Sequence, residues 1–427
     1  MGIVAINPAH PPQRFCFPTT FYPPFSFGGD GVGVQRLARA LVRRGHHVTV
    51  VHDVDAHTVL HDGPTPALPK YDDGVEVIPI RSRVADLSIL LTQQTGRPTL
   101  NAGRLREILD DGKFDVVNFH NPSLLGGPGI LSYGGDATRL YMAHEHWLVC
   151  PTHVLWRHNR ELCDHRQCFR CQLAYRRPPQ LWRKTGYLNA QLHHIDAFIA
   201  MSEFSRNKHY EFGFPRTMEV LPFFLPDPEV APTLPDDEAS PHHRPYFLFV
   251  GRLEKIKGLD QVIPLFRQYP EADLLIAGEG SHGAALASLA AGLDQVSFLG
   301  RLPPDQLGKY YRHAVSTIVP SVCFETFGVI IIESFRERTP VIARRLGPFP
   351  EIMAQSGGGE LFDTSDELLA AMRRLQHDRP YRADKAANAY RSYVDRWTES
   401  AVLPQYLDIV ARAHAMRSSL GGRGSRD

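Results

Sequence analysis

The first half of the chain repeats one pattern, in which a short apolar run is followed by a longer segment with helical periodicity. Short runs of this kind, rich in β-branched residues, are typical of strands that are buried on both faces. Strands that alternate with helices predict a parallel sheet with helices packed on both sides. The predicted strands are 3–6, 48–51, 75–80, 115–119, 139–143 and 197–201, and the clearest predicted helices are 34–44 and 100–110.

The pattern stops at residues 223–245, which are rich in proline and acidic residues and have little periodicity. Such a stretch indicates a linker between domains. The strand–helix pattern then restarts and predicts a second doubly wound unit. Its predicted strands are 246–250, 273–277, 296–299, 316–319 and 341–343, and its predicted helices are 259–268, 304–313, 326–336 and 366–377.

Together these patterns predict an α/β protein with two doubly wound, Rossmann-like domains that face each other across a cleft. Ligands of such folds bind outside the carboxyl ends of the strands. The predicted parts are a first domain at 1–222 with a cysteine-rich insert at 150–183, a linker at 223–245, a second domain at 246–383, helices at 384–415 that dock back on the first domain, and a disordered tail at 416–427.

Composition and charge narrow the function classes. The 427 residues carry 47 basic and 46 acidic side chains, a formal net charge of +1. The chain therefore lacks the general basic field that binds nucleic acid. No apolar run reaches the roughly 18 residues that suggest a membrane-spanning helix. The first residues are expected to form a strand rather than a signal peptide. We expect a cytoplasmic protein, with peripheral contact at the inner face of a membrane left open.

The segment Phe324–Glu333 places two carboxylates eight residues apart, at Glu325 and Glu333, with Phe327 and Gly328 between them. A helix over this segment would separate the carboxylates by about 12 Å along its axis. Its N-terminus, with free N–H groups and the positive end of the dipole, suits a diphosphate. The segment is therefore predicted to hold both ends of a sugar nucleotide. The alternative is a buried helix with two surface glutamates.

Two glycine-containing turns are candidates for binding phosphate. Gly28–Gly33 precedes the first helix, after a stretch at 13–27 that is expected to be a long loop. Its glycines would let the backbone approach phosphate oxygens. Gly251–Gly258 follows the first strand of the second domain and contains Arg252 and Lys257, whose charges suit a diphosphate. The alternatives are a flexible entry loop and solvated surface charge.

His144 directly follows the predicted strand 139–143. At the carboxyl end of a strand it would face the cleft, where an imidazole can polarise a substrate hydroxyl or stabilise developing charge. A structural histidine is the alternative.

Four of the six cysteines lie close together in the sequence, at Cys150, Cys163, Cys168 and Cys171. Four thiolates suit tetrahedral zinc, and one pair has the Cys-x2-Cys spacing of zinc sites. Part of the spacing is also similar to that of plant-type iron–sulfur proteins, but there the fourth cysteine lies downstream. Structural zinc, no metal, an iron–sulfur cluster and disulfides therefore stay open. The surrounding insert is rich in arginine and aromatic residues, which suits a flap over a second substrate.

In this order, the motifs resemble glycosyltransferase family 4, a group of retaining sugar-nucleotide transferases with the two-domain GT-B architecture. The resemblance covers nearly the whole chain, and its most specific element is the pair Glu325 and Glu333, which matches the Glu-x7-Glu pattern. His144-Glu145-His-Trp147 is similar to the His-Asp-x-Trp of the acceptor loop, with glutamate in place of aspartate. Some members carry a cysteine-bearing segment after this point. The remaining matches are Gly28-Gly29, Arg252, Lys257-Gly258 and the base-cradling segment 296–302.

The resemblance implies an enzyme that moves a sugar from a nucleoside-diphosphate sugar to the hydroxyl of a sugar, lipid-linked or small-molecule acceptor, in polysaccharide, glycolipid or natural-product glycan assembly. Arg252 and Lys257 would neutralise the diphosphate, Glu333 would bind the ribose, and no catalytic metal or other cofactor would be required. His144 and Glu325 are the implied catalytic residues. The implied donor-binding residues are Gly28, Gly29, Arg252, Lys257, Leu302, Glu325, Phe327, Gly328, Val329 and Glu333.

Two rival functions fit the same motifs. One is a sugar-nucleotide epimerase or hydrolase on the same architecture, and the other is a catalytically inactive binding protein. The sequence identifies neither the donor nucleotide and sugar nor the acceptor.

Overall fold

The computed structural model describes most of the chain, and the predicted strand at 3–6 lies outside the described residues. So do the middle of the predicted linker and the last six residues of the predicted tail. The described residues are 11–61, 66–67, 71–228 and 239–421.

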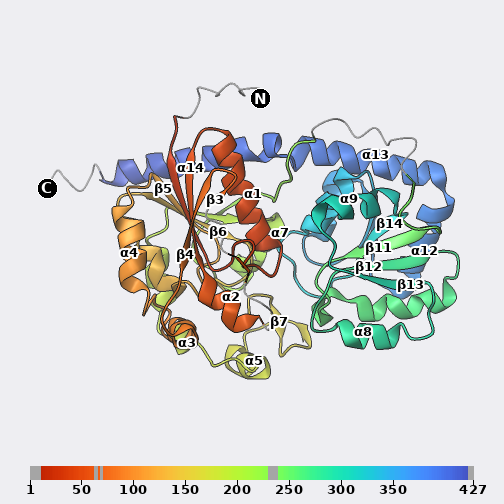
Figure 1. The fold of residues 1–427 in the computed structure, drawn as a ribbon, viewed down its shortest axis with the longest axis horizontal. Helices are drawn as coiled ribbons and strands as arrows, with labels where there is room; N and C mark the ends of the chain where they lie inside the picture. Colours follow the sequence, from red (N-terminus) through yellow and green to blue (C-terminus); the bar gives the residue numbers. More distant parts are fainter. Residues whose placement is uncertain (1–10, 62–65, 68–70, 229–238, 422–427) are drawn as a thin grey trace. The chain divides into compact units, whose positions relative to one another are not determined.

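The chain divides into two compact units, each built on one sheet flanked by helices (Figure 1). Unit 1 comprises 1–202, 206–222 and 403–427, and unit 2 comprises 203–205 and 223–402.

The sheet of unit 1 has eight strands in the order β10-β9-β6-β5-β1-β2-β4-β3, and only the β3–β4 pair is antiparallel. The central strand β1 (Arg14–Thr19) pairs with β2 (His47–Asp53) and β5 (Val116–Phe119). The other strands of this sheet are β3 (Tyr71–Asp72), β4 (Val75–Ile80), β6 (Thr138–Ala143), β9 (Ala197–Ala200) and β10 (Met218–Val220).

The position of β1 corrects the prediction of a loop at 13–27. Phe15, Cys16 and Phe17 are fully buried at the centre of the sheet. The apolar run of β1 is only three residues long, between Arg14 and Pro18, which made the strand hard to recognise. The turn from β1 to the first helix is therefore much shorter than the sequence suggested.

Amphipathic helices cover the sheet of unit 1. In α1 (Gly29–Arg43) the buried residues include Val34, Leu37, Ala38 and Leu41, a spacing that forms one apolar stripe. The other helical segments of the first half are α2 (Val54–Leu60), α3 (Ala85–Thr95), α4 (Ala102–Asp111), η1 (Gly127–Ser132), α5 (Cys168–Ala174), η2 (Leu181–Lys184), α6 (Tyr187–Leu192) and α7 (Glu203–Glu211), and the insert also holds the small β7 (Trp156–Arg157) and β8 (Glu161–Leu162) hairpin.

The sheet of unit 2 has six parallel strands in the order β13-β12-β11-β14-β15-β16. Side chains of β11 (Tyr246–Val250) alternate between two cores, as expected for a strand covered on both faces. Phe247 and Phe249 lie in the larger core, while Tyr246 and Leu248 pack with residues of α9 in the smaller one. The other strands are β12 (Asp273–Ala277), β13 (Val296–Gly300), β14 (Ser316–Val319), β15 (Val341–Arg344) and β16 (Gly359–Phe362).

Two predicted helices of unit 2 differ from the structure. The segment 259–268 forms two 3₁₀ segments, η4 (Leu259–Gln261) and η5 (Ile263–Gln268), and Pro264 lacks the N–H that a continuous helix would use. The predicted helix 326–336 begins only at α10 (Val329–Arg336), because Gly328 has a φ of 123°. The remaining helical segments are η3 (Lys255–Lys257), α8 (Gly283–Leu289), α9 (Pro304–His313), α11 (Phe349–Ser356) and α12 (Ser365–His377).

The closing helices also differ from the prediction. The helix α13 (Arg379–Arg396) belongs to unit 2, where Ala389 and Tyr393 are buried. Only the part of α14 (Glu399–Gly421) that begins at Leu403 belongs to unit 1. The predicted disordered tail is helical up to Gly421. α14 continues past Ala413, a buried residue, to Gly421.

The start of the predicted linker is ordered as well. The Leu225 N–H donates to the carbonyl of Trp397 at 2.9 Å, and Leu225 is fully buried. The Glu399 N–H donates in turn to the Leu225 carbonyl at 2.9 Å, so the backbone of this segment is bonded to the junction of α13 and α14. Within the described ranges, no helix is both long and apolar enough to cross a membrane.

Candidate functional site

The loops that follow β11 and β14 leave the sheet of unit 2 at its topological switch point. From β11 the chain builds outward through β12 and β13, then returns to the other side of β11 to form β14. In open α/β sheets ligands bind outside the carboxyl ends of the strands at this point. The two loops are joined by a hydrogen bond from the Val322 N–H to the Ile256 carbonyl, at 2.9 Å. The fold thus brings two separately predicted motifs together.

Lys257 and Glu325 form an ion pair at the centre of this site. Lys257 Nζ lies 2.6 Å from Glu325 Oε1, and the side chains are only 20% and 23% exposed. The Ser321 hydroxyl donates to the same oxygen at 2.9 Å. Burial opposes the charge of each group, but the attraction outweighs it, so the pKa of Lys257 is raised and that of Glu325 is lowered. Both groups are held in their charged forms.

Gly258 sets the close approach of these two loops. It has a φ of 77°, and a Cβ at this position would lie 2.1 Å from the carbonyl oxygen of Pro320. Glycine is the residue that accepts both the left-handed backbone and the missing space. The sequence motif Lys257-Gly258 therefore has a steric basis.

Arg252 lies in the same loop but is more exposed, at 46%, and pairs with Glu254 at 2.6 Å. Its charge is close enough to help lower the pKa of Glu325. The structure thus places Arg252, Lys257 and Glu325 in one electrostatic cluster.

The other predicted donor residues of unit 2 lie in α10, just before it, or just after β13. Glu333 lies on α10 and accepts a hydrogen bond from the Tyr311 hydroxyl at 3.2 Å. Phe327 is buried, and Val329 is the first residue of α10. Leu302 is half-buried just after β13. Because α10 starts four residues after Glu325, the two glutamates do not lie on one continuous helix, which corrects the assumption behind the predicted 12 Å spacing.

Sequence reasoning missed a third glycine turn at this edge, Gly278–Gly280, which directly follows β12. A Cβ on Gly278 would lie 1.9 Å from the carbonyl oxygen of Gly251. A Cβ on Gly280 would lie 2.4 Å from the carbonyl oxygen of Leu253. The turn therefore packs directly against the Arg252 loop. The available signal was Gly-Glu-Gly at the end of a predicted strand.

In unit 1, His144 lies directly after β6 and contacts a histidine that the sequence reasoning missed. His120 follows the neighbouring strand β5, and its Nδ1 lies 2.8 Å from His144 Nε2. Both are buried, and burial lowers the pKa of His144 to about 4 and that of His120 well below its usual range. Both imidazoles are therefore neutral at pH 7. The signal for His120 was Phe-His-Asn at the end of a predicted strand.

The predicted glycine loop lies beside this histidine pair. Gly28 is the N-cap of α1, in extended backbone, and Gly29 is its first residue. Asp30, in the first turn, is close enough to raise the pKa of His144 against the larger effect of burial. A Cβ on Gly31 would lie 2.8 Å from Cβ of Ser26, so Gly31 needs its small size.

Glu145 and Trp147 connect this region to the insert. Glu145 Oε1 lies 2.6 Å from His153 Nδ1, within the segment that follows. Trp147 is buried and stacks on Tyr141, with 6.4 Å between ring centroids. The side chain after His144 is thus used to hold the insert.

The four clustered cysteines lie near one another as free thiols. The pKa of Cys163 is raised by burial and, to a smaller extent, by the charges of the other three. Tetrahedral zinc at about 2.3 Å from each sulfur would require sulfurs about 3.8 Å apart. In the part of the chain that the structure describes, only His242, His243 and Asp273 bring three ligand atoms within 4.8 Å of one another. The four cysteines do not form such a group, and the prediction of zinc is not confirmed.

Comparison with known proteins identifies the family. The model "Glycosyltransferase Family 4" matches residues 27–226, and "Glycosyl transferases group 1" matches 231–392. The phosphatidyl-myo-inositol mannosyltransferase of Mycolicibacterium smegmatis is 23% identical over 422 residues, which cover 95% of this chain and 96% of that one. The sulfoquinovosyl transferase SQD2 of Arabidopsis thaliana is 31% identical over 144 residues, 33% of this chain but only 28% of that protein.

Solved structures show the same fold. Sucrose-phosphate synthase from Thermosynechococcus elongatus has a TM-score of 0.70 at 17% identity, over 95% of this chain and 100% of that one. The Anabaena protein HepE, in complex with UDP and glucose, has a TM-score of 0.65 at 17% identity, over 93% and 99% of the two chains. With two Rossmann-like domains and both halves matched by family models, the chain belongs to the family 4, group 1 glycosyltransferases of the GT-B fold.

Proposed function

We propose that this glycosyltransferase takes its sugar from a nucleoside-diphosphate sugar and transfers it to an acceptor hydroxyl with retention of configuration. The observation that carries the proposal is the Lys257–Glu325 ion pair beside Arg252, at the switch point of the unit 2 sheet. A structural neighbour solved with UDP and glucose supports the donor class. Retention rests on the family resemblance, and the anomeric form of the product tests it.

Each charged group has a chemical part in this proposal. The diphosphate carries about two negative charges as it leaves, and Arg252 and Lys257 neutralise them. Lys257 exchanges part of its pairing with Glu325 for a phosphate oxygen. The carboxylate that it releases then accepts hydrogen bonds from sugar hydroxyls. The site thus passes from an internal ion pair to a pair of contacts with the donor.

The other residues position the donor and stabilise the reacting sugar. Glu333 binds the ribose, and the backbone around Gly328 approaches the sugar. His144 acts as a neutral hydrogen-bonding group, because burial lowers its pKa to about 4. An oxygen of the departing diphosphate takes the proton of the acceptor hydroxyl, so no side chain of the protein is needed as a base. Stabilisation of the leaving group supplies most of the rate.

A donor panel followed by acceptor trials tests this function. We expect Lys257→Ala and Glu325→Ala to lower the transfer rate by about 100-fold or more, as loss of one preorganised charge contact does in other enzymes. Lys255→Ala is the matched control, because Lys255 is an exposed cation in the same short turn. Transfer at the wild-type rate in both site variants would overturn the assignment. Isomerised or hydrolysed donor without any acceptor would instead favour an epimerase or hydrolase.

Structural zinc stays a proposal that rests on the cysteine spacing alone. The measurement is the metal content of protein purified under reducing conditions, with Cys163→Ser/Cys168→Ser as the control. About one zinc per chain, lost in the control, would support it. Zinc-free wild-type protein would remove it. No catalytic step depends on the outcome.

A further inference from the structure

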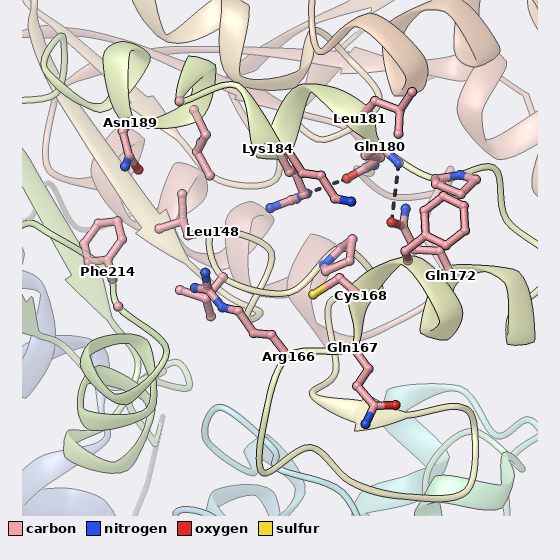
Figure 2. A pocket seen from close by; sticks show the side chains of 18 of the residues that line it. Leu148, Arg166, Gln167, Cys168, Gln172, Gln180, Leu181, Lys184, Asn189 and Phe214 are labelled. Carbon is pink, nitrogen blue, oxygen red and sulfur yellow. Dashed lines mark hydrogen bonds between the residues drawn. The ribbon is translucent and has the colours of Figure 1, made fainter.

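A cavity of about 590 Å³ lies within unit 1, and no residue of the proposed donor site lines it. Its wall comes from the insert, from α6 and from the loop at 213–215. Figure 2 shows Leu148 and Phe214 on one side of this cavity and Gln172 and Gln180 on the other. The Gln180 N–H donates to Gln172 Oε1 at 3.4 Å, which ties α5 to the segment that closes the wall.

The charged side chains that line this cavity are all cationic. Four of its lining side chains are cationic, namely Arg166, Arg170, Arg183 and Lys184, and none is acidic. Among the described residues, none of the four forms an ion pair with a carboxylate. The acidic residues of the same insert are used elsewhere: Glu161 and Asp164 pair with Arg157. Four cations gathered without counter-charge repel one another, and a bound anion would relieve this repulsion.

Arg183 is the most constrained of the four cations. Its Nε donates to Gln180 Oε1 at 2.6 Å, and its guanidinium lies 4.6 Å from the ring centre of Trp182 and 5.2 Å from that of Trp147. Burial lowers its pKa to about 10, so it stays charged at pH 7. Its Nη2 is buried and has no hydrogen-bond partner within the described part of the chain. A buried donor of this kind is costly unless it meets an acceptor, and guanidinium groups bind phosphate oxygens well.

The rim of the cavity is apolar as well as cationic. Phe169 and Leu181 line it and are 47% and 59% exposed. Lys184 Nζ lies 5.5 Å from the ring centre of Phe169. Exposed apolar side chains next to unpaired cations suit an anion that carries an organic group. A phosphate ester has both parts.

We propose that this cavity binds the phosphate group of a phosphate-bearing acceptor. The phosphate can belong to a soluble sugar phosphate or to a lipid headgroup, and the chemistry of recognition is shared. The role of this ligand as the acceptor rests on the proposed transferase function, whereas the binding of a phosphate ester does not. The insert thereby becomes a determinant of acceptor specificity.

Two double variants isolate the cavity. Arg170→Gln/Lys184→Gln removes two exposed cations of the cavity wall that make no hydrogen bond within the described residues. Arg176→Gln/Arg177→Gln removes two exposed cations of the same insert that do not line the cavity. Both variants keep the donor site intact, so phosphate binding there is common to both. The overall charge change is also the same.

The binding test uses two probes in the absence of donor. Glucose 6-phosphate is titrated by calorimetry, and phosphatidylcholine vesicles with and without phosphatidic acid are tested by cosedimentation. For the cavity variant we expect the dissociation constant of at least one probe to rise about 10- to 100-fold, which corresponds to about 1.4 to 2.7 kcal/mol for the two contacts together. The control variant should change it little.

The outcomes distinguish a soluble sugar phosphate from a lipid phosphate, and they distinguish phosphate binding from a role of the ligand as acceptor. Selective loss of glucose 6-phosphate binding identifies a soluble sugar phosphate, and selective loss of vesicle binding identifies a lipid phosphate. Equal behaviour of the two variants, or no binding of either probe by the wild type, overturns the proposal. If the cavity variant loses binding but transfers sugar to every active acceptor at the wild-type rate, the acceptor role is wrong. A complete lack of transferase activity with intact probe binding would refute the proposed function but leave the phosphate site.

Discussion

Replacing Lys257 with methionine would leave Glu325 charged in a site built for an ion pair. Lys257 Nζ lies 2.6 Å from Glu325 Oε1, and both side chains are about one-fifth exposed. Breaking a fully buried pair by removing one partner costs about 3–5 kcal/mol. Because these groups keep some contact with water, we expect Lys257→Met to destabilise unit 2 by about 2–3 kcal/mol.

The conservative partner variant separates charge from packing. Glu325→Gln keeps the volume of the side chain and can keep the hydrogen bond from Ser321, which is 2.9 Å long. Lys257→Met/Glu325→Gln removes both charges, so it should be more stable than Lys257→Met alone. We expect a coupling energy of about 1–3 kcal/mol from the complete cycle. The double variant should nevertheless stay inactive, because the donor loses both contacts.

The pH dependence follows from the directions of the two pKa shifts. The pKa of Glu325 is lowered from 4.5, so its contribution is present above about pH 4.5 and is lost as the pH falls through its lower, folded-state pKa. The pKa of Lys257 is raised from 10.5, so its contribution is present below about pH 10.5 and is lost as the pH rises through its higher, folded-state pKa. The stability difference between wild type and Lys257→Met should therefore be largest between these limits and shrink in acid.

Hydrogen exchange of peptides from 316–336 is the appropriate assay, because it reports the stability of β14 and α10 directly. Unfolding of the whole chain would mix two units and need not be a two-state process. Lys255→Met is the control for removal of a cation from the same turn. Single-variant effects that add to the double-variant value within about 0.5 kcal/mol would show that the pair is not coupled. That result would refute the reasoning from its geometry.

Three further predictions concern backbone space, the histidine pair and the last helix. Gly258→Ala should destabilise unit 2 by several kcal/mol and abolish transfer, because its Cβ would clash with the Pro320 carbonyl. The control Gly292→Ala has a similar φ of 75° but no atom within 4 Å of its Cβ, so it should cost only about 1 kcal/mol, and equal melting shifts of the two variants would contradict the clash. The transfer rate should not change with His144 protonation between pH 6 and 8, and it should fall toward pH 4, where this histidine gains charge. A step in the pH–rate profile near pH 6.5 that disappears in His144→Gln would show that the pKa of His144 is not lowered. Tyr406→Phe removes the acceptor of a 3.0 Å hydrogen bond from Asn118 and should destabilise unit 1 by about 1–3 kcal/mol, as measured by hydrogen exchange of peptides that contain β5. Unchanged exchange of these peptides would refute that contribution.

Much of the fold follows from local patterns. The strands β4, β11, β12 and β14 have the predicted bounds, because each is a short apolar run closed by polar or turn-forming residues. The prediction failed where a local pattern was weak or where one residue broke it. Only the buried centre of the sheet explains β1, whose apolar run is three residues long. Pro264 and Gly328 each interrupt a predicted helix through backbone conformation rather than polarity.

In the candidate site, too, some features could be predicted from local patterns and others depended on tertiary packing. The residue types and spacing of Arg252, Lys257, Glu325 and Glu333 are visible in the sequence, since phosphate and sugar recognition requires cations and carboxylates near strand ends. His120 was missed because its relation to His144 depends on the pairing of β5 with β6, which no local pattern encodes. The cationic cavity also escaped notice, because its wall joins residues of the insert to others as far along the chain as 213–215.

By itself, therefore, the sequence determined the alternation of strands and helices, the two-part organisation and the chemical groups of the proposed sugar-nucleotide site. These features depend on periodicity and residue type, which are local. Only the tertiary structure decided that Lys257 is held by Glu325, that His120 lies against His144, and that four cations share one cavity without a carboxylate. These features depend on which strands become neighbours and how closely their loops approach, and such proximity is set by packing across the whole unit.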